Sequence, residues 1–497
     1  MKVIYSEALL ASAPLIGLIV MLVFFRWTIL QSSLSALILI TVIAFYHFDL
    51  TIDIAFGSII KALLITLDIA IILLGAIVFF KVMKLTGVMD VLQQKLLLLT
   101  PDHRLQIILI AWLLGGFIEG IAGFGTPAVV VAPLLISIGL PVFMSVILTL
   151  IANSTAVTFG AVGTPMRVGF DGLNIEGVAE TASKINLIAG PVIPLIMLAM
   201  IVSVKKEKCL KSFIEAVPWT LWAGFAFTVP MWLFVKIGQE FGSLLGALTG
   251  LLLVGISVKF NFLAPGKPWK IDKASSSATN IAPFNAAIPY YIPYIFLIVT
   301  LITGKFLLKN LELNIVLPGN LTYMIRLFNP GWFFLFTLLI ICFIIKNTWN
   351  ILITSFKESL SKAVKPVLAI GFIAVFVQVF INAGMLNQIA VNLKVSSLAF
   401  ATPFLGAFGS FLTGSATVSN MLIAPILTSI DTNGINKILA LQLLGAAAGN
   451  MIALQNILTI SAAVDSKEKE GKILSHLLAP CIIYLFFILL ISKLWPC

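Results

Sequence analysis

Two carboxylates lie inside strongly apolar stretches of the sequence, where an ionisable side chain is costly to bury. Glu119 stands beside a glycine-rich segment that interrupts an apolar stretch, and Asp68 lies in the middle of the apolar run 63–80. Carboxylates at such positions are usually functional, and burial favours the neutral form of the group. Both are therefore candidates for proton coupling. The alternative is a structural role, as a hydrogen bond that closes a hairpin or holds two helices together.

Glycine, hydroxyl and amide residues gather at similar breaks in both halves of the chain. Such groups can hydrogen-bond a carboxylate and a neighbouring hydroxyl; the alternative is that they pair only with unwound backbone. We expect the substrate-binding residues to be Gly123, Phe124, Gly125, Thr126, Asn153, Ser154, Thr155, Thr413, Gly414, Ser415, Thr417, Asn420, Asn450 and Gln455. Arg167 is a further candidate for contact with an anion, although an arginine at the headgroup level is the commoner explanation.

The segment 123–127 (Gly-Phe-Gly-Thr-Pro) predicts a loop tip followed by the start of a helix. Pro127 suits the first turn, where its missing N–H costs little, and Thr126 can cap the helix. A helix N-terminus attracts a carboxylate. Tight packing of glycines between helices is the alternative, but it explains neither the cap nor the repetition described below.

The composition indicates a polytopic membrane protein. The chain has 497 residues, of which 60% are hydrophobic and 10% charged, and its mean hydropathy is +1.12. Soluble domains carry about 25% charged residues. The net charge of +11 does not indicate nucleic-acid binding, because the lysines lie in short loops between apolar runs, as the positive-inside rule predicts.

The breaks belong to an internal repeat. Gly123 corresponds to Gly414 and Thr126 to Thr417, and further along Asn153 corresponds to Asn450. Non-helical backbone in hydrocarbon leaves polar groups unpaired at several kcal/mol each, so it persists only inside protein or beside a watery cavity. In transporters such breaks mark the binding site.

The apolar runs predict an all-α fold of about twelve spans plus two re-entrant hairpins. Runs long enough to span occur at about 8–25, 31–47, 62–80, 185–204, 214–236, 242–258, 288–308, 331–346, 366–386 and 473–492. The hairpins are expected at about 105–139 and 398–430, and a broken helix follows each, at about 142–164 and 437–464. The first hairpin's arms are too short to cross about 30 Å at 1.5 Å per residue.

Loop charge predicts the orientation. The densest basic clusters lie at 81–104, 205–211, 259–273, 346–365 and 467–472. Placing all five in the cytoplasm makes the first hairpin open from the cytoplasm and the second from outside, so the two repeats are inverted. Each repeat has three helices, a hairpin, a broken helix and a closing helix. We expect a first repeat at 1–204, a connecting helix pair and linker at 205–287, and a second repeat at 288–497. This architecture is typical of secondary transporters.

Other function classes lack their motifs in this sequence. Cys209, Cys342, Cys481 and Cys497 stand singly, so no metal site or cofactor is expected. The sequence has no HExxH, GxSxG or Walker-type loop, which argues against an enzyme or a nucleotide-driven pump. A channel would need rings of charge or carbonyls, whereas two separate, inverted hairpin sites argue for alternating access. A sodium-coupled symporter of another small anion remains the alternative, since hydroxyls, amides and unwound carbonyls also suit sodium.

The chain resembles the L-lactate permease family over essentially its whole length. The motifs that carry the resemblance are Phe117-x-Glu119-Gly120-x-x-Gly123-Phe124-Gly125-Thr126-Pro127, Ala132-Pro133-Leu134, Ile151-Ala152-Asn153, Thr413-Gly414-Ser415-x-Thr417-x-Ser419-Asn420 and Gly449-Asn450-Met451-Ile452. The chain departs from the family pattern at Ala416, where an aspartate is usual, and at Leu454, where a proline is usual.

The resemblance implies import of L-lactate, and in some members of D-lactate or glycolate, by proton symport across a bacterial cytoplasmic (inner) membrane. It also implies an elevator-like movement of the hairpin-bearing domain. The expected partners are a small monocarboxylate, protons and the lipid bilayer, and not nucleic acid; a homo-oligomer is left open.

Overall fold

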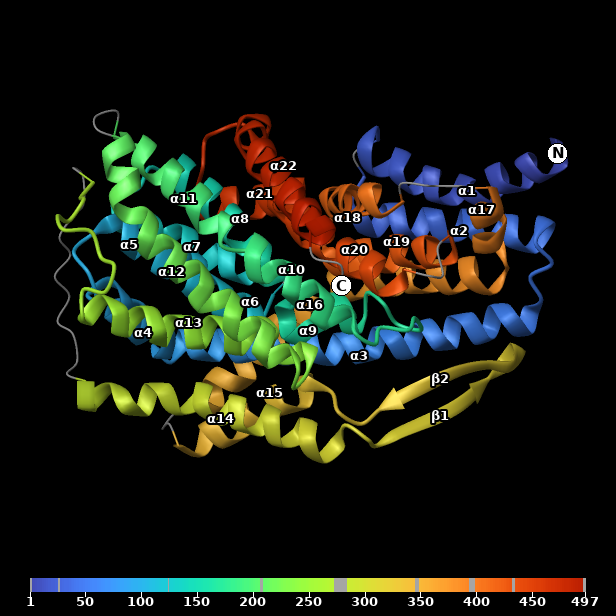
Figure 1. Cartoon of the computed structure of the whole chain (residues 1–497). Coiled ribbons are helices and arrows are strands. Elements are labelled where there is room, and N and C mark those ends of the chain that lie inside the picture. Colours follow the sequence, from blue (N-terminus) through green and yellow to red (C-terminus); the bar gives the residue numbers. More distant parts are fainter. Residues whose placement is uncertain are drawn as a thin grey trace. The chain divides into compact units, whose positions relative to one another are not determined.

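The computed structural model describes residues 2–25, 27–123, 125–205, 209–271, 284–344, 348–392, 398–430 and 434–494. The described chain is almost entirely helical, apart from a two-stranded sheet (Figure 1). It divides into two compact units, each built from both halves of the sequence. The first unit comprises Met1–Val91, Ala282–Ser396 and Ala424–Thr432, and the second comprises Leu92–Ile281, Ser397–Ile423 and Asn433–Cys497.

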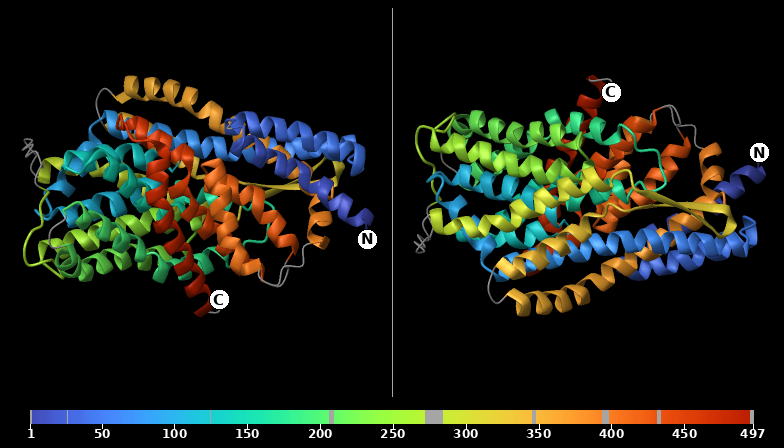
Figure 2. Two further views of the ribbon diagram at one scale, coloured as in Figure 1. Left: turned by 90° about the horizontal axis from the view of Figure 1, so that it is seen from above. Right: turned by 90° about the horizontal axis from the view of Figure 1, so that it is seen from below.

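The first unit contains a pair of long helices, α3 (Ile52–Leu85) and α16 (Thr348–Asn382), that pack along each other. Both views of Figure 2 show this blue and orange pair side by side. Helix α2 (Ile29–His47) also packs on α16, and its N-terminus is fixed by a reciprocal capping box between Thr28 and Gln31. The unit's other helices are α1 (Lys2–Val23), α14 (Phe284–Leu308), α15 (Pro330–Ile344) and α17 (Met385–Asn392).

A β-hairpin follows α14, in a stretch for which the sequence analysis predicted no regular structure. Strand β1 (Glu312–Leu317) pairs antiparallel with β2 (Leu321–Arg326). Gly319 and Asn320 turn the chain with positive φ angles of 73° and 56°, which these two residue types tolerate best. The Pro-Gly-Asn turn between β-branched and aromatic residues was the signal for this hairpin.

The second unit consists of helices and short helical turns. They are α5 (His103–Ile108), the π-helix η1 (Leu109–Leu114), α6 (Gly115–Ile121), α7 (Thr126–Ser137), α8 (Val142–Val157), α9 (Gly160–Arg167), α10 (Val178–Ala189), α11 (Val192–Ser203), α12 (Cys209–Val235), the 3-10 turn η2 (Gln239–Phe241), α13 (Gly242–Lys259), α18 (Leu398–Thr413), α20 (Ile435–Gly449), the 3-10 turn η4 (Asn450–Ile452), α21 (Leu454–Ala463) and α22 (Glu470–Leu494). Helices α4 (Val88–Leu97) and α19 (Ala416–Ile430) are divided between the two units.

Glycine allows the close approach of α6 and α13 in the second unit. A Cβ atom at Gly120 would lie 2.5 Å from the backbone nitrogen of Leu244. Beside this approach, the rings of Trp112 and Phe227 pack edge to face at 5.2 Å. The helix that carries Glu119 therefore packs with its backbone directly against the backbone of α13.

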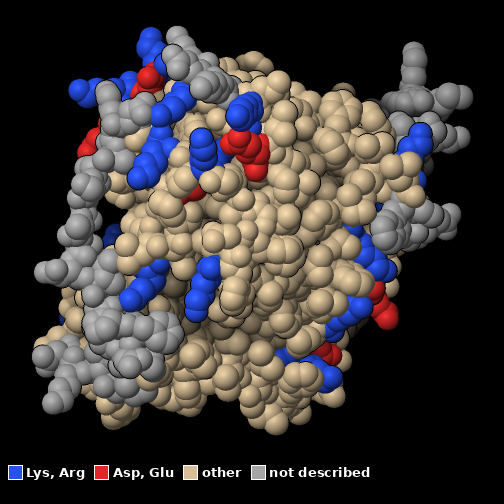
Figure 3. All heavy atoms as spheres, turned by 60° about the vertical axis from the view of Figure 1, so that its left-hand side comes forward, with Lys and Arg blue, Asp and Glu red and all other residues tan. Residues whose placement is uncertain are grey.

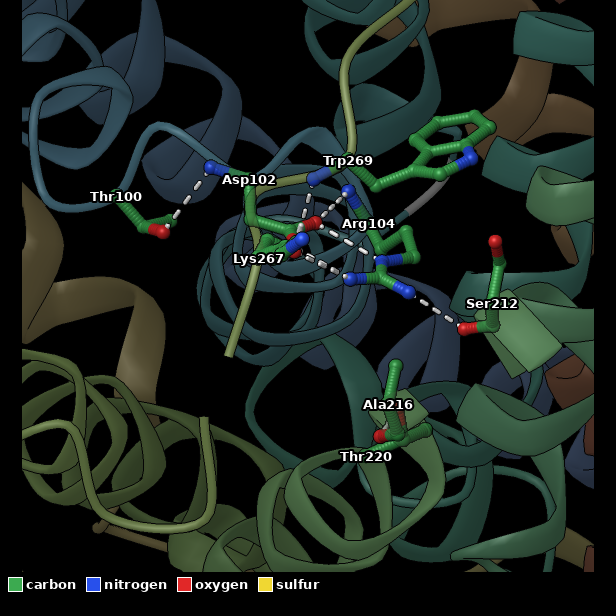
Figure 4. Close-up of polar contacts among 8 residues, drawn as sticks. All are labelled: Thr100, Asp102, Arg104, Ser212, Ala216, Thr220, Lys267 and Trp269. Atoms are coloured by element: carbon green, nitrogen blue, oxygen red, sulfur yellow. Dashed lines mark hydrogen bonds and ion pairs between the residues drawn. The ribbon is translucent and has the colours of Figure 1, made fainter. Parts of the chain in front are cut away.

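A buried ion pair fixes the start of α5 (Figure 4). The Arg104 guanidinium, 1% exposed, makes two bonds to Asp102, from Nε to Oδ1 at 3.1 Å and from Nη2 to Oδ2 at 2.6 Å. It also donates to the carbonyls of Ser212 and Lys267, while the backbone N–H of Trp269 donates to Asp102 Oδ2. This cluster joins α5, α12 and the segment after α13.

Helices fold back at both places where hairpins were expected. Helix α6 ends at Ile121 and α7 begins at Thr126; Gly115 and Val131 then lie in contact, with 3.5 Å between a Cβ built on Gly115 and Val131 Cγ2. In the second half, Ser419 Oγ in α19 donates to the carbonyl of Gly406 in α18 at 2.8 Å. Each pair is a helical hairpin.

The number and length of the spans differ from the prediction. Among the described residues, ten helices are long and apolar enough to cross a membrane, or up to eleven if the bent pair α8–α9 is one span, against about twelve expected. The apolar stretches Glu7–Leu22 of α1 and Pro330–Phe343 of α15 are not in this count, and each borders residues whose side chains lie outside the described part. The first hairpin arm is longer than predicted, because α5, η1 and α6 continue one another over His103–Ile121. The protein is a multi-pass membrane protein.

The surface agrees with this assignment. On the face shown in Figure 3, charged side chains form small groups separated by wide areas of other residues. Many large apolar side chains are exposed, among them Leu63, Leu67 and Phe343. Lipid is the solvent that favours such a surface, since no hydrophobic penalty applies there.

Candidate functional site

The second unit contains a cavity with about 400 Å³ of empty space, counting its open mouth. The cavity proper has only about 50 Å³, which is small beside the roughly 300–1,000 Å³ of sites for drug-sized ligands. The cavity is lined by residues from both hairpins and both broken helices, namely Glu119, Gly125, Asn153, Val157, Gly160, Ala161, Pro165, Gly414, Ser415, Ala416, Thr417, Asn450 and Asn456. The breaks that the sequence repeats are therefore brought together at one place.

The tip of the first hairpin requires glycine. Gly123 and Gly125 have φ angles of 54° and 78°, in the left-handed region that glycine adopts without strain. Gly125 is the N-cap of α7, and no side chain caps this helix. The prediction that Thr126 caps it was wrong, because Thr126 is already the first helical residue. Pro127 stands in the first turn, as predicted.

The first broken helix contains three consecutive left-handed residues between α8 and the end of α9. Ala161, Val162 and Gly163 have φ angles of 43°, 53° and 78°. A β-branched residue such as Val162 is a rare outlier in this region, and such strain costs of order 1–3 kcal/mol per residue. All three side-chain positions are buried. Strained backbone of this kind concentrates at functional sites.

Glu119 is the one ionisable residue among the described residues that line the cavity. Its side chain is almost completely buried, with 4% exposure, and Oε2 accepts a hydrogen bond from Asn153 Nδ2 at 3.0 Å. The carboxylate lies against Gly160, where a Cβ atom would collide with Oε1. The space that holds Glu119 is thus made by the missing side chain of a residue in the first broken helix.

The tip of the second hairpin resembles the first. Gly414, the counterpart of Gly123, also has a positive φ, of 71°. Thr413 Oγ1 bonds to the backbone on both sides of the tip, donating to the Gly409 carbonyl at 2.8 Å and accepting from the Ser415 N–H at 3.3 Å. The first turn of α19 follows directly and lines the cavity.

The second broken helix contributes two asparagines to the cavity. Helix α20 ends at Gly449, and a 3-10 turn separates it from α21. Asn456 Nδ2 donates to the backbone carbonyl of Asn450 at 3.0 Å and to its side-chain Oδ1 at 2.6 Å. Asn450 is thereby held by a residue one turn further along the chain.

The structure brings together about half of the predicted site residues. Those that line the cavity are Glu119, Gly125, Asn153, Gly414, Ser415, Thr417 and Asn450. Gly123, Thr126 and Thr413 lie at the hairpin tips without lining it, and Gln455 lies against Gly414. Phe124 lies outside the described residues.

Other predicted residues take part in contacts within the protein. Ser154 donates to the carbonyl of Ile151. Thr155 lies 3.1 Å from the Tyr484 hydroxyl, which donates to Asn186. Asn420 Nδ2 donates to the carbonyl of Pro165 at 2.8 Å and so joins the second hairpin to the first broken helix. None of these three side chains lines the cavity.

The two remaining charged candidates also lie away from the cavity lining. Arg167 is buried with 5% side-chain exposure and lies 4.0 Å from Glu240. Asp68 belongs to the first unit, where its Oδ1 and its backbone carbonyl accept bonds from Asn329 Nδ2 at 2.7 and 3.0 Å. Asn329 Oδ1 in turn accepts from the N–H of Gly331, so this group joins α3 to the start of α15.

Sequence reasoning missed Gly160, Ala161 and Asn456 as cavity residues, together with the apolar Val157, Pro165 and Ala416. The first two lie inside the predicted break at 152–165, where the run Gly-Ala-Val-Gly-Thr-Pro was the available signal. Asn456 has no counterpart in that signal. It stands inside a helix, and only the fold brings it to Asn450.

Comparisons with known proteins identify the family of this chain. A family model described as L-lactate permease matches residues 7–495. The L-lactate permease of Escherichia coli (strain K12) is 27% identical over 451 residues, covering 81% of this chain and 80% of that protein. The L-lactate permease of Streptococcus iniae is 27% identical over 449 residues, covering 86% and 91%. The glycolate permease GlcA of Escherichia coli (strain K12) is 27% identical over 546 residues, covering 98% and 95%. Since the family match extends over nearly the whole chain, this protein belongs to the L-lactate permease family.

Proposed function

We propose that the protein is a secondary active transporter that imports L-lactate, D-lactate or glycolate together with protons across a bacterial cytoplasmic membrane. The names of its relatives, L-lactate permease and glycolate permease, support this substrate class. The observation that carries the proposal is the cavity, in which both repeated breaks meet around one carboxylate. A permease family also argues for transport rather than for catalysis.

Glu119 is the group that couples protons to the substrate. A substrate carboxylate and an ionised Glu119 would be two like charges in one poorly solvated cavity, and a like charge disfavours ionisation. Binding of the anion therefore favours a protonated Glu119, and protonation favours binding of the anion. This reciprocity is the linkage that symport needs. Asp68, the other candidate for proton coupling, does not line the cavity and bonds to Asn329 in the other unit.

The division of the chain supports an elevator-like form of alternating access. All cavity-lining residues belong to the second unit, so the complete binding site could move as one body in an elevator-like cycle. The helical hairpins α6–α7 and α18–α19 would then be re-entrant and inverted relative to each other, as loop charge predicts.

Uptake of labelled L-lactate into proteoliposomes tests the proposal. We expect accumulation when a pH gradient, acidic outside, is imposed without sodium, and competition by D-lactate and glycolate. A sodium gradient at constant pH should give no accumulation.

Accumulation driven by sodium alone would replace the proton by sodium and place coupling at the hydroxyl, amide and carbonyl groups of the breaks. Absence of lactate uptake under both gradients, with protein that is folded and inserted, would refute lactate as the substrate.

A further inference from the structure

The repeat-related asparagines Asn153 and Asn450 both line the cavity, but their amides are held in opposite senses. An asparagine side chain has an acceptor end, Oδ1, and a donor end, Nδ2. Which end is engaged by the protein decides which end remains for a ligand. The hydrogen bonds around the two residues settle this for each.

At Asn450 the protein engages the acceptor. A backbone carbonyl can only accept, so the atom of Asn456 that bonds to the carbonyl of Asn450 must be the amide nitrogen. The same nitrogen meets the side chain of Asn450 at 2.6 Å, which must therefore present Oδ1. Within the described chain Asn450 Nδ2 has no hydrogen-bond partner, and two N–H donors remain.

At Asn153 the protein engages the donor. Asn153 Nδ2 donates to Glu119 Oε2, while Asn153 Oδ1 is buried and has no hydrogen-bond partner among the described residues. A buried acceptor without a donor destabilises the protein, because its lost hydration is not replaced. A hydroxyl group that enters the cavity supplies the donor that this atom lacks.

We propose that a 2-hydroxy acid binds with its carboxylate at Asn450 Nδ2 and its hydroxyl donating to Asn153 Oδ1, and that Asn456 is the positioning residue that fixes this polarity. The proposal rests on the proposed function and adds the orientation of the substrate and the origin of its selectivity. Asn456 does not itself need to touch the substrate.

The surroundings of Asn450 suit a carboxylate. Ser415, directly before α19, and Ala416 and Thr417, in its first turn, line the same cavity. The first N–H groups of a helix have no partner within the helix, and they carry a partial positive charge. Glu119, the one carboxylate among the described lining residues, bonds to Asn153 and not to Asn450. The anion is thus received by donors, and the hydroxyl by an acceptor.

This polarity predicts which analogues the site rejects. Propionate has the carboxylate but no hydroxyl, so Asn153 Oδ1 stays unpaired. Pyruvate has a carbonyl in place of the hydroxyl and presents an acceptor to an acceptor. Sites built to bond a substrate hydroxyl discriminate strongly against analogues that lack it, because their own polar group is left unsatisfied. We expect lactate to inhibit uptake at a concentration at least about tenfold lower than either analogue.

Three variants of the full-length protein test the assignment, with inhibition of labelled-lactate exchange by lactate, propionate and pyruvate as the readout. Asn456→Leu and Asn456→Asp should each weaken the binding of lactate and of propionate by the same factor, about tenfold for one lost anchoring bond. The ratio between the two acids should stay at the wild-type value. Asn456→Asp should be the weaker binder, because an acidic side chain turns the donor end of Asn450 away from the cavity.

Asn153→Leu should instead reduce the preference for lactate over propionate. The inhibition constant of lactate should rise to that of propionate. Glu119 also loses its bond from Asn153 in this variant, but that loss acts on both acids alike, so the ratio between them reports the hydroxyl alone. A purely structural role of Asn153 or Asn456 would lower the melting temperature in detergent without separating the two acids. Asn186→Leu is the matched control, since the buried Asn186 amide bonds Thr158 and Tyr484 away from the cavity.

An unchanged lactate-to-propionate ratio in Asn153→Leu, or a changed ratio in Asn456→Leu, would overturn the proposed orientation. If the wild type exchanges lactate in that case, the proposed function stands and only the orientation fails. If the folded wild type exchanges no lactate, the proposed function fails first.

Discussion

Asn153 Nδ2 donates to Glu119 Oε2 at 3.0 Å, which links the first broken helix to the first hairpin within one unit. The two residues lie 34 positions apart in the chain. Both line the cavity, so the group proposed to bind the substrate hydroxyl is bonded to the group proposed to carry the proton. Substrate and proton therefore act on one pair of side chains.

Glu119→Gln should separate exchange from accumulation. The amide keeps the size of the side chain but cannot bind a proton at ordinary pH, so uptake driven by a pH gradient should fall to background. Lactate–lactate exchange needs no net proton movement and should persist. Both are measured in the same proteoliposomes, by imposing or omitting the gradient.

Asp68→Asn is the matched control for this prediction. Asp68 is also a carboxylate within an apolar run, but it accepts a hydrogen bond from Asn329 in the first unit. We expect it to keep accumulation driven by the pH gradient. If Asp68→Asn abolished accumulation and Glu119→Gln did not, the coupling group would be Asp68.

The sequence analysis located the glycine tips but not the strained turn. Gly123, Gly125 and Gly414 were expected at the breaks from their residue type, and all three have positive φ angles, which glycine adopts without strain. Ala161 and Val162 adopt the same backbone region, although alanine and valine ordinarily avoid it. Packing of the fold imposes that conformation, and local sequence does not encode it.

Side-chain partners were less predictable than backbone breaks. Asn153 and Asn450 could be found from the repeat, but the partners that set their polarity, Glu119 and Asn456, become neighbours only through tertiary structure. Thr155 shows the opposite error. Its position beside Asn153 suggested binding, whereas it lies at the Tyr484 hydroxyl. Adjacent residues on a helix point in different directions, so proximity in sequence did not place them in one site.

Gly160→Ala should inactivate transport without unfolding the protein. The added methyl group would collide with the Glu119 carboxylate and displace it from Asn153. A displacement of about 1 Å at a site of this kind can cost about a hundredfold in rate. Lactate exchange should fall accordingly, as measured by initial rates in proteoliposomes.

Gly255→Ala is the control for that substitution, because a Cβ atom there would meet only Leu99 Cδ1, at 3.8 Å. It should leave exchange unchanged. Wild-type exchange in Gly160→Ala would show that Glu119 does not need its present position.

Thr155→Val should lower stability without changing the KM for lactate, whereas Thr417→Val should raise that KM. Thr155 is buried beside Tyr484 and does not line the cavity, so its loss should cost about 1 kcal/mol of stability and leave the KM for lactate unchanged. Thr417 lines the cavity in the first turn of α19, so its loss should raise the KM. Melting temperature and initial uptake rates distinguish the two. A raised KM in Thr155→Val would restore Thr155 to the binding site.

Arg104→Met should destabilise the protein strongly without affecting substrate affinity. The guanidinium is buried, makes two bonds to Asp102 and donates to the carbonyls of Ser212 and Lys267. Removing one partner of a buried pair leaves an uncompensated charge and costs about 3–5 kcal/mol. The melting temperature in detergent should fall clearly, while the KM of the protein that remains folded should match the wild type.

The double variant Asp102→Asn with Arg104→Met distinguishes a paired charge from simple loss of packing. Removing both charges relieves the uncompensated carboxylate, so the double variant should be more stable than the sum of the single effects predicts. Lys184→Met removes one partner of the half-exposed pair with Glu180 and should change stability by less than about 1 kcal/mol. Strict additivity of the two substitutions would mean that the Asp102–Arg104 bonds contribute nothing as a pair. The cluster in Figure 4 would then stabilise the start of α5 through its carbonyl bonds alone.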